Sequence, residues 1–126
     1  METPENLYYT NDHEWIKVEG DTGTIGITDF AQRELGDIVY LEIESLNESL
    51  ETEEVFGTIE AVKTVSDLFM PVSGKVIEIN TSLEDNPEVV NKDPFGEGWL
   101  IKVELSDKSQ LDNLLTSEAY KELTSV

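Results

Sequence analysis

Short segments in which apolar and polar side chains alternate predict a chain built mainly from β-strands. We expect strands over the following segments, each bounded by turn residues: Glu14–Val18, Thr22–Ile27, Ile38–Ile43, Val55–Val62, Ser66–Met70, Lys75–Asn80 and Trp99–Glu104. Turn residues at Glu19-Gly20-Asp21 join the first two segments into a hairpin. Many short strands at close spacing are typical of a β-sandwich or barrel.

A short helix is expected between the second and third of these strands. Thr28-Asp29 precedes it, with Asp29 and Gln32 spaced as in a capping box. Gly36 ends the helix, because glycine is favoured just past a helix C-terminus.

The second helix is expected at the C-terminus. We therefore expect helices only near the two ends of the strand-rich region. Ser106 or Asp107 caps it, and its apolar side chains repeat with a helical period at Leu111, Leu114, Leu115 and Leu123. The stretch 81–98 holds two prolines and two glycines, which predicts turns.

The composition narrows the class of protein. Leu, Ile, Val and Phe make up about 29% of the 126 residues, enough for a folded domain despite a net charge of −20. We expect one domain over residues 1–126, and charge repulsion favours a monomer. So acidic a chain is a poor ligand for nucleic acid or anionic membranes, which attract clustered Lys and Arg.

Other features exclude further classes. The absence of cysteine removes disulfides, thiolate metal sites and thiol nucleophiles, and a single histidine excludes a multi-histidine metal centre. No apolar run approaches a membrane span, and the acidic start is unlike a secretory or transit peptide. We therefore expect a cytoplasmic protein without a metal.

One lysine stands apart from its surroundings. Between Arg33 and Lys75 the only basic residue is Lys63, among ten acidic ones. It falls at the turn between two predicted strands, where Gly, Asn or Asp is usual. Lys63 is therefore either a solvated lysine that balances nearby acids or a lysine displayed for covalent modification. Spacing alone does not choose between these two interpretations.

The surrounding segments favour the second interpretation, a lysine displayed for covalent modification. In their order along the chain they closely resemble the H proteins of the glycine cleavage system: His13-Glu14-Trp15, Ile25–Asp29 with Ala31-Gln32, Leu35–Val39, Ile59–Thr64, Pro71–Asn80 and Pro94–Trp99. The resemblance implies a lipoyl/biotinyl-type barrel-sandwich hybrid of two antiparallel sheets with short helices. It also implies lipoic acid in amide linkage to Lys63.

The resemblance further implies a carrier without catalysis of its own. Its arm takes the aminomethyl group of glycine from the glycine decarboxylase P protein to the aminomethyltransferase T protein. The dihydrolipoyl dehydrogenase L protein then reoxidises it.

Further site residues are expected by resemblance. Glu14, Asp67 and Asp12 line the cleft where the loaded arm folds back, with His13 in the cleft wall. Carboxylates suit a cargo that carries a protonated amine.

Recognition by the lipoylating enzyme is expected to involve Glu60 and Gly74. Three alternatives stay open: a carrier that relays lipoyl or octanoyl groups to other lipoyl domains, an acidic module for Ca²⁺ or a basic protein, and a biotinyl carrier. The acidic module lacks EF-hand spacing, and the biotinyl carrier lacks Met on either side of Lys63.

Overall fold

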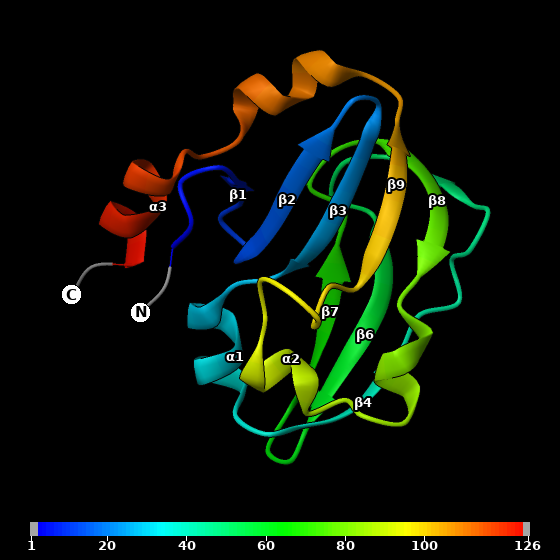
Figure 1. The fold of residues 1–126 in the computed structure, drawn as a ribbon, viewed down its shortest axis with the longest axis vertical. Helices are drawn as coiled ribbons and strands as arrows, with labels where there is room; N and C mark the ends of the chain where they lie inside the picture. The colour runs from blue at the N-terminus through cyan, green and yellow to red at the C-terminus, as the bar shows by residue number, and fades with distance from the viewer. Residues whose placement is uncertain (1–2, 125–126) are drawn as a thin grey trace.

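Two antiparallel β-sheets form the body of the protein in the computed structural model, which describes residues 3–124 (Figure 1). The larger sheet has the strand order β1-β2-β3-β9-β8-β5. Its strands are β1 (Tyr8–Tyr9), β2 (Glu14–Glu19), β3 (Thr22–Ile27), β5 (Ser49–Leu50), β8 (Gly74–Ile79) and β9 (Ile101–Leu105). The smaller sheet has the order β4-β6-β7 and consists of β4 (Ile38–Glu42), β6 (Val55–Ala61) and β7 (Val65–Phe69). The predicted mainly β class with two antiparallel sheets is confirmed.

The hydrophobic core lies between the two sheets, because the alternating strands turn their apolar side chains inward. Ile16, Ile25 and Ile101 of the larger sheet are fully buried, and Phe56 and Ile59 of the smaller sheet belong to the same cluster. Each such side chain contributes about 1.5–3 kcal/mol by leaving water. This packing fixes the β6–β7 hairpin relative to the rest of the protein.

The helix α1 (Asp29–Leu35) follows β3 and begins differently from the prediction. Thr28 is its N-cap, with Oγ1 accepting a hydrogen bond from the backbone N–H of Ala31 at 3.1 Å. The predicted capping box is wrong, because the Gln32 side chain donates to the Asp29 carboxylate at 2.7 Å. The predicted end is confirmed: Gly36 has φ +80° and its N–H donates to the Gln32 carbonyl.

The stretch 81–98 holds more helix than its turn residues indicated. It forms a 3₁₀ helix, η1 (Thr81–Glu84), and a single helical turn, α2 (Val89–Lys92). The prediction that helix is added only at the two ends is therefore wrong. Buried Leu83 and Val90 explain both elements, since each anchors a polar segment on the core.

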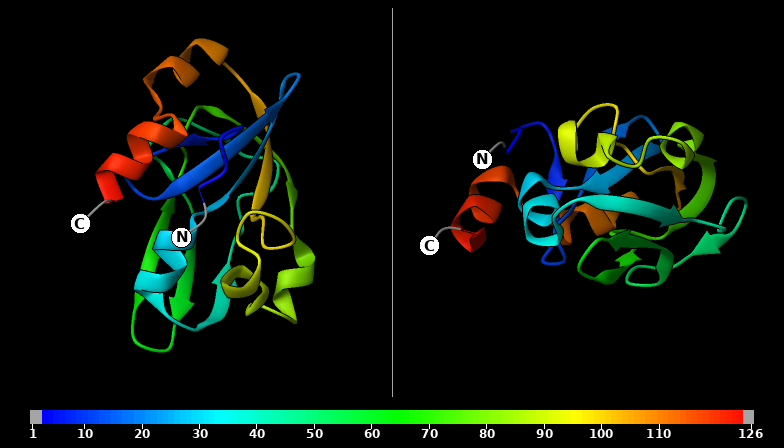
Figure 2. Two further views of the ribbon diagram at one scale, coloured as in Figure 1. Left: turned by 60° about the vertical axis from the view of Figure 1, so that its left-hand side comes forward. Right: turned by 90° about the horizontal axis from the view of Figure 1, so that it is seen from below.

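The predicted C-terminal helix is divided into two elements. Asp107 caps a 3₁₀ helix, η2 (Lys108–Asn113), and α3 (Ser117–Thr124) follows separately. Between them Leu115 pairs with Tyr9 through two backbone hydrogen bonds of 2.8 and 2.9 Å. This pairing requires extended backbone, so a continuous helix is excluded. It also turns α3 to the side of the sheets next to α1 (Figure 2).

Candidate functional site

Lys63 lies at the tip of the β6–β7 hairpin, which forms the lower end of the molecule in Figure 1. The connection is residues 62–64, and the Ala61 N–H donates to the Thr64 carbonyl at 2.8 Å to close it. The Val62 N–H donates to the Asp37 carbonyl at 3.0 Å and ties the tip to the start of β4. The backbone of the tip is thus fixed, while the side chain of Lys63 is exposed.

The Lys63 side chain extends along the C-terminal end of α1. A β-carbon placed on Gly36 would lie 3.5 Å from Lys63 Cε, an ordinary van der Waals distance, so the lysine side chain passes directly beside Gly36. Helix C-termini attract cations through their unpaired carbonyls. In the part of the chain that the structure describes, no carboxylate forms an ion pair with Lys63. Its amine is therefore accessible to an acylating enzyme.

A cleft of about 150 Å³ opens between α1, β7 and the turn formed by residues 10–14. It is lined by Asp12, His13, Glu14, Ile27, Ala31, Glu34, Leu35, Ile59, Ser66, Asp67 and Leu68. Four of these side chains are acidic and the described lining includes no lysine or arginine. The structure thus brings together Asp12, His13, Glu14 and Asp67, the four residues that sequence reasoning assigned to one cleft.

Glu14 is the buried acid of this cleft, with 2% of its surface exposed. Thr10 Oγ1 donates to one carboxyl oxygen at 2.9 Å, and the Phe69 N–H donates to the other at 3.2 Å. Burial nevertheless dominates and raises the pKa of Glu14 to about 8. At neutral pH this carboxyl group is therefore mostly protonated.

Asp12 links the cleft to the loop 51–54. Its carboxyl group lies next to that of Glu53, where desolvation and then the Asp12 contact raise the pKa of Glu53. Glu53 has left-handed backbone with φ +73°, and its N–H donates to the Met70 carbonyl at 2.8 Å. Two adjacent carboxyl groups repel each other when both are ionised, so this edge of the cleft also favours a cation.

His13 occupies the turn that joins these acids and has left-handed backbone, with φ +67°. Its N–H donates to the Thr10 carbonyl at 3.2 Å, and its carbonyl accepts from the Thr28 N–H at 3.0 Å. The ring lies 4.6 Å from the Phe30 ring, centroid to centroid. Desolvation lowers the pKa of His13, against the opposing charge of Asp12. His13 is therefore a neutral wall residue near pH 7.

Glu34 was missed by sequence reasoning. It lies in the last turn of α1 and lines the cleft. The sequence did hold a signal for this role. An acidic residue in the last turn of a helix interacts unfavourably with the helix dipole, so its presence there indicates a function outside the helix.

The two residues assigned to enzyme recognition lie apart. Glu60 is exposed on β6 and pairs in register with Tyr40 and Val65, next to the hairpin tip. Gly74 is buried at the start of β8, where a β-carbon would come within 2.7 Å of the Glu104 carbonyl oxygen. Gly74 thus lies outside the hairpin, and the close approach of β8 to β9 accounts for it.

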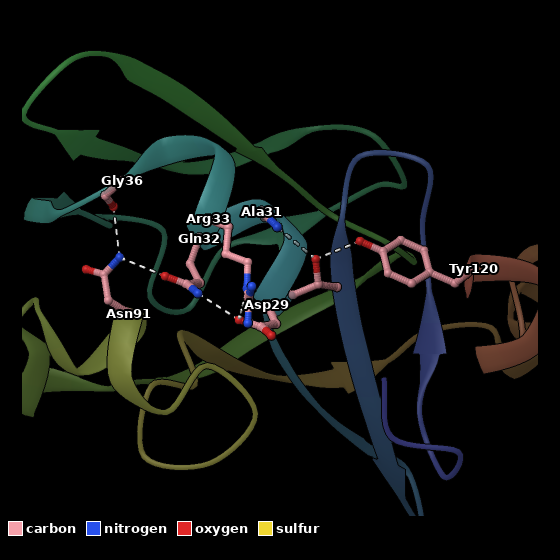
Figure 3. Close-up of polar contacts among 8 residues, drawn as sticks. Asp29, Ala31, Gln32, Arg33, Gly36, Asn91 and Tyr120 are labelled. Carbon is pink, nitrogen blue, oxygen red and sulfur yellow. Dashed lines mark hydrogen bonds and ion pairs between the residues drawn. The ribbon is translucent and has the colours of Figure 1, made fainter. Parts of the chain in front are cut away.

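Asn91 of α2 fixes the end of α1 that faces Lys63. Its side-chain amide donates to Gln32 Oε1 at 3.0 Å and to the Gly36 carbonyl at 2.8 Å (Figure 3). Its side-chain oxygen accepts from the Ile38 N–H at 2.9 Å. One residue thus joins α1, α2 and β4 beside the hairpin tip.

The described residues hold neither a metal centre nor a membrane-spanning helix. Among residues 3–124 no group of three or more His, Asp or Glu side chains is arranged to hold a metal ion. Within the same residues no helix is long and apolar enough to cross a membrane.

Two antiparallel sheets that display an exposed lysine at a hairpin tip are typical of a lipoyl-type carrier domain. The comparisons agree. Residues 7–126 match the family model described as "Glycine cleavage H-protein". The chain is 60% identical over 121 residues to the glycine cleavage system H protein of Bacteroides fragilis, covering 96% of each chain. It is 56% identical over 124 residues to that of Salinibacter ruber, covering 98% of this chain and all of the other.

A solved structure supports the same assignment. The crystal structure of a glycine cleavage system H protein from Mycobacterium marinum superposes with a TM-score of 0.87 at 36% identity, covering 98% of this chain and 99% of that one. The barrel-sandwich fold predicted by resemblance is confirmed. The chain belongs to the glycine cleavage H-protein family, whose members are lipoyl carriers in glycine cleavage.

Proposed function

We propose that Lys63 bears lipoic acid in amide linkage and that the chain is a non-catalytic carrier subunit, a single domain that acts as a monomer. The arm takes the aminomethyl group of glycine from the P protein to the T protein, and the L protein reoxidises it. When attached, the dithiolane supplies carrier and redox chemistry that no standard side chain offers. A cytoplasmic location stays a prediction of the sequence.

The observation that carries this proposal is the exposed Lys63, which forms no ion pair within residues 3–124, on a fixed hairpin tip next to an acidic cleft. The fixed backbone orients the amine, and the exposed side chain leaves room for a ligase and for three successive partners. Tethering keeps the reactive end at high local concentration near a docked enzyme.

The cleft supplies the second part of the proposed mechanism. Asp67 lies four residues beyond Lys63 along the hairpin, so extended chain separates them by at most about 13 Å. Glu14, Asp12 and Asp67, joined by Glu34, surround the space where a protonated amine gains from negative charge. Glu14 releases its proton as the cation approaches, because a neighbouring positive charge favours the carboxylate. The apolar residues Ile27, Ile59 and Leu68 exclude water from the bound cargo.

We also propose that the lipoylating enzyme recognises the hairpin partly through Glu60. Exposure of this carboxylate next to the tip supports a direct contact. The participation of Gly74 stays a prediction from the resemblance, and its burial supports an indirect effect through β8.

A reconstituted glycine decarboxylation assay tests the proposal. With the P, T and L proteins, glycine, tetrahydrofolate and an electron acceptor for the L protein present, Lys63→Arg should abolish turnover, because arginine keeps the charge but cannot accept the lipoyl amide. Lys75→Arg is the matched control, since Lys75 is an exposed lysine on β8 and should leave turnover intact. Full activity of Lys63→Arg would overturn the proposal.

A further inference from the structure

The C-terminal helix α3 reaches His13, a residue of the cleft lining, through the side chain of Tyr120. Only 1% of Tyr120 is exposed, and its ring stacks on Tyr9 with centroids 4.7 Å apart. Its hydroxyl lies 2.9 Å from His13 Nδ1 and 2.7 Å from Thr28 Oγ1. Figure 3 shows the ring extending from α3 towards the start of α1.

One partner of this hydroxyl lines the cleft, and the other caps the helix that forms another of its walls. His13 lies in the turn that carries Asp12 and Glu14, and Thr28 caps the helix that carries Ala31, Glu34 and Leu35. A phenol both donates and accepts, so the hydroxyl can serve both partners whichever nitrogen of His13 bears the proton. We call this arrangement the Tyr120 bridge: the Tyr120 hydroxyl with His13 and Thr28.

The turn at His13 needs such support. A left-handed backbone at a residue with a β-carbon persists only where surrounding contacts hold it. Here Thr10 and Thr28 hold the backbone of His13, and Tyr120 holds its ring. Since Asp12 and Glu14 flank His13, a change in this turn would move both carboxyl groups relative to α1.

We propose that Tyr120 is a positioning residue for the carrier reaction, setting the spacing of the two cleft walls through the Tyr120 bridge. The inference rests on the proposed function, because the spacing matters through the cargo held in the cleft. Through this residue α3, remote from Lys63 in sequence, controls how long the aminomethyl cargo survives hydrolysis between enzymes.

The test uses Tyr120→Phe in the lipoylated full chain. Phenylalanine keeps the stack on Tyr9 and removes only the hydroxyl. Lipoylation and loading by the P protein should match wild type, while loss of the aminomethyl group from the isolated loaded carrier should accelerate about 2- to 10-fold, the range for one net hydrogen bond. Tyr9→Phe is the matched control: it removes a hydroxyl from the same stack, one that donates to the Pro4 carbonyl, and the loss rate should not change.

Two readouts separate positioning from general destabilisation. The ¹⁵N shift of His13 Nδ1 should change in Tyr120→Phe and stay unchanged in Tyr9→Phe. The loss rates of Tyr120→Phe and Glu14→Gln should also combine non-additively, because both act on one turn. If Tyr120→Phe folds poorly, His13→Asn tolerates the left-handed backbone but lacks the ring, and it should accelerate the loss in the same way.

The outcomes are distinguishable. Equal loss rates for wild type and Tyr120→Phe, with both fully loaded, would overturn the inference and leave the carrier function standing. A wild type that is not lipoylated or cannot be loaded would overturn the proposed function and the inference together.

Discussion

At the scale of single residues, Glu14 shows how an unfavourable environment serves a site. A carboxyl at this depth loses solvation, and the two hydrogen bonds that it accepts recover only part of that loss. The free-energy cost of ionising the buried carboxyl group is reduced when a cation enters the cleft. The residue is therefore better suited to a positively charged occupant than to an empty pocket.

The raised pKa of Glu14 predicts a pH dependence of stability. The folded state binds the proton up to about pH 8, whereas the unfolded chain releases it near 4.5. The free energy of unfolding should therefore fall as the pH rises through this window, by up to about 1.4 kcal/mol per unit. Urea unfolding at pH 6 and pH 8 should show this loss in wild type and a much smaller one in Glu14→Gln.

Glu19→Gln, at the exposed end of the same strand, is the control and should behave as wild type. Parallel pH profiles for wild type and Glu14→Gln would contradict a raised pKa at Glu14.

At the scale of elements, three of them meet at Asn91. Its side chain accepts from the first N–H of β4, that of Ile38, and donates to the carbonyl of Gly36 at the end of α1. Glu14 does the same for the edge of β7 through the Phe69 N–H. Side chains thus complete the backbone hydrogen bonding where strands and helices end.

Asn91→Ala should lower the free energy of unfolding by about 1–3 kcal/mol, because it leaves the Ile38 N–H and the Gly36 carbonyl without this partner. Urea unfolding of the purified variant measures the change. Asn86→Ala, an exposed asparagine in the preceding loop, should cost less than about 0.5 kcal/mol. Equal effects of the two variants would show that the Asn91 contacts contribute nothing.

The alternation of apolar and polar residues within single segments predicted most of the strands. It failed where contacts between distant segments determine the structure. Alternation within β6 and β7 is local, so the hairpin that bears Lys63 was predicted to within a residue or two. The two-residue strand β1 depends on pairing with β2, and the break between η2 and α3 depends on Leu115 pairing with Tyr9. No spacing along the chain reveals either contact. The first turn of α1 was misassigned because Thr28 and Asp29 are both good caps, and only the geometry chooses between them.

The cleft was predictable only by resemblance. Asp12, Glu14 and Asp67 come from two separate segments, and composition does not show that they converge. The contact between Thr28 and Tyr120 was not predicted, because it joins residues 92 positions apart in the sequence. The hydrogen-bonded bridge between the cleft walls therefore became visible only in three dimensions.

At the scale of the whole molecule, a fixed scaffold displays one reactive amine at its end. The core between the sheets holds the hairpin, and α1, the turn at His13 and β7 form a cleft of about 150 Å³ beside it. The net charge of −20 keeps copies of the chain apart and favours partners with basic surfaces. These features suit a carrier that visits several enzymes in turn.

The central claim is that Lys63 is the lipoyl attachment site, and mass spectrometry tests it most directly. The chain is expressed with lipoate and a lipoate ligase, its intact mass is measured, and the adduct is located by peptide fragmentation. We predict one lipoyl group per chain, confined to Lys63 and absent from Lys75. An unmodified Lys63 in folded protein, alongside a fully modified control lipoyl domain, would contradict the account.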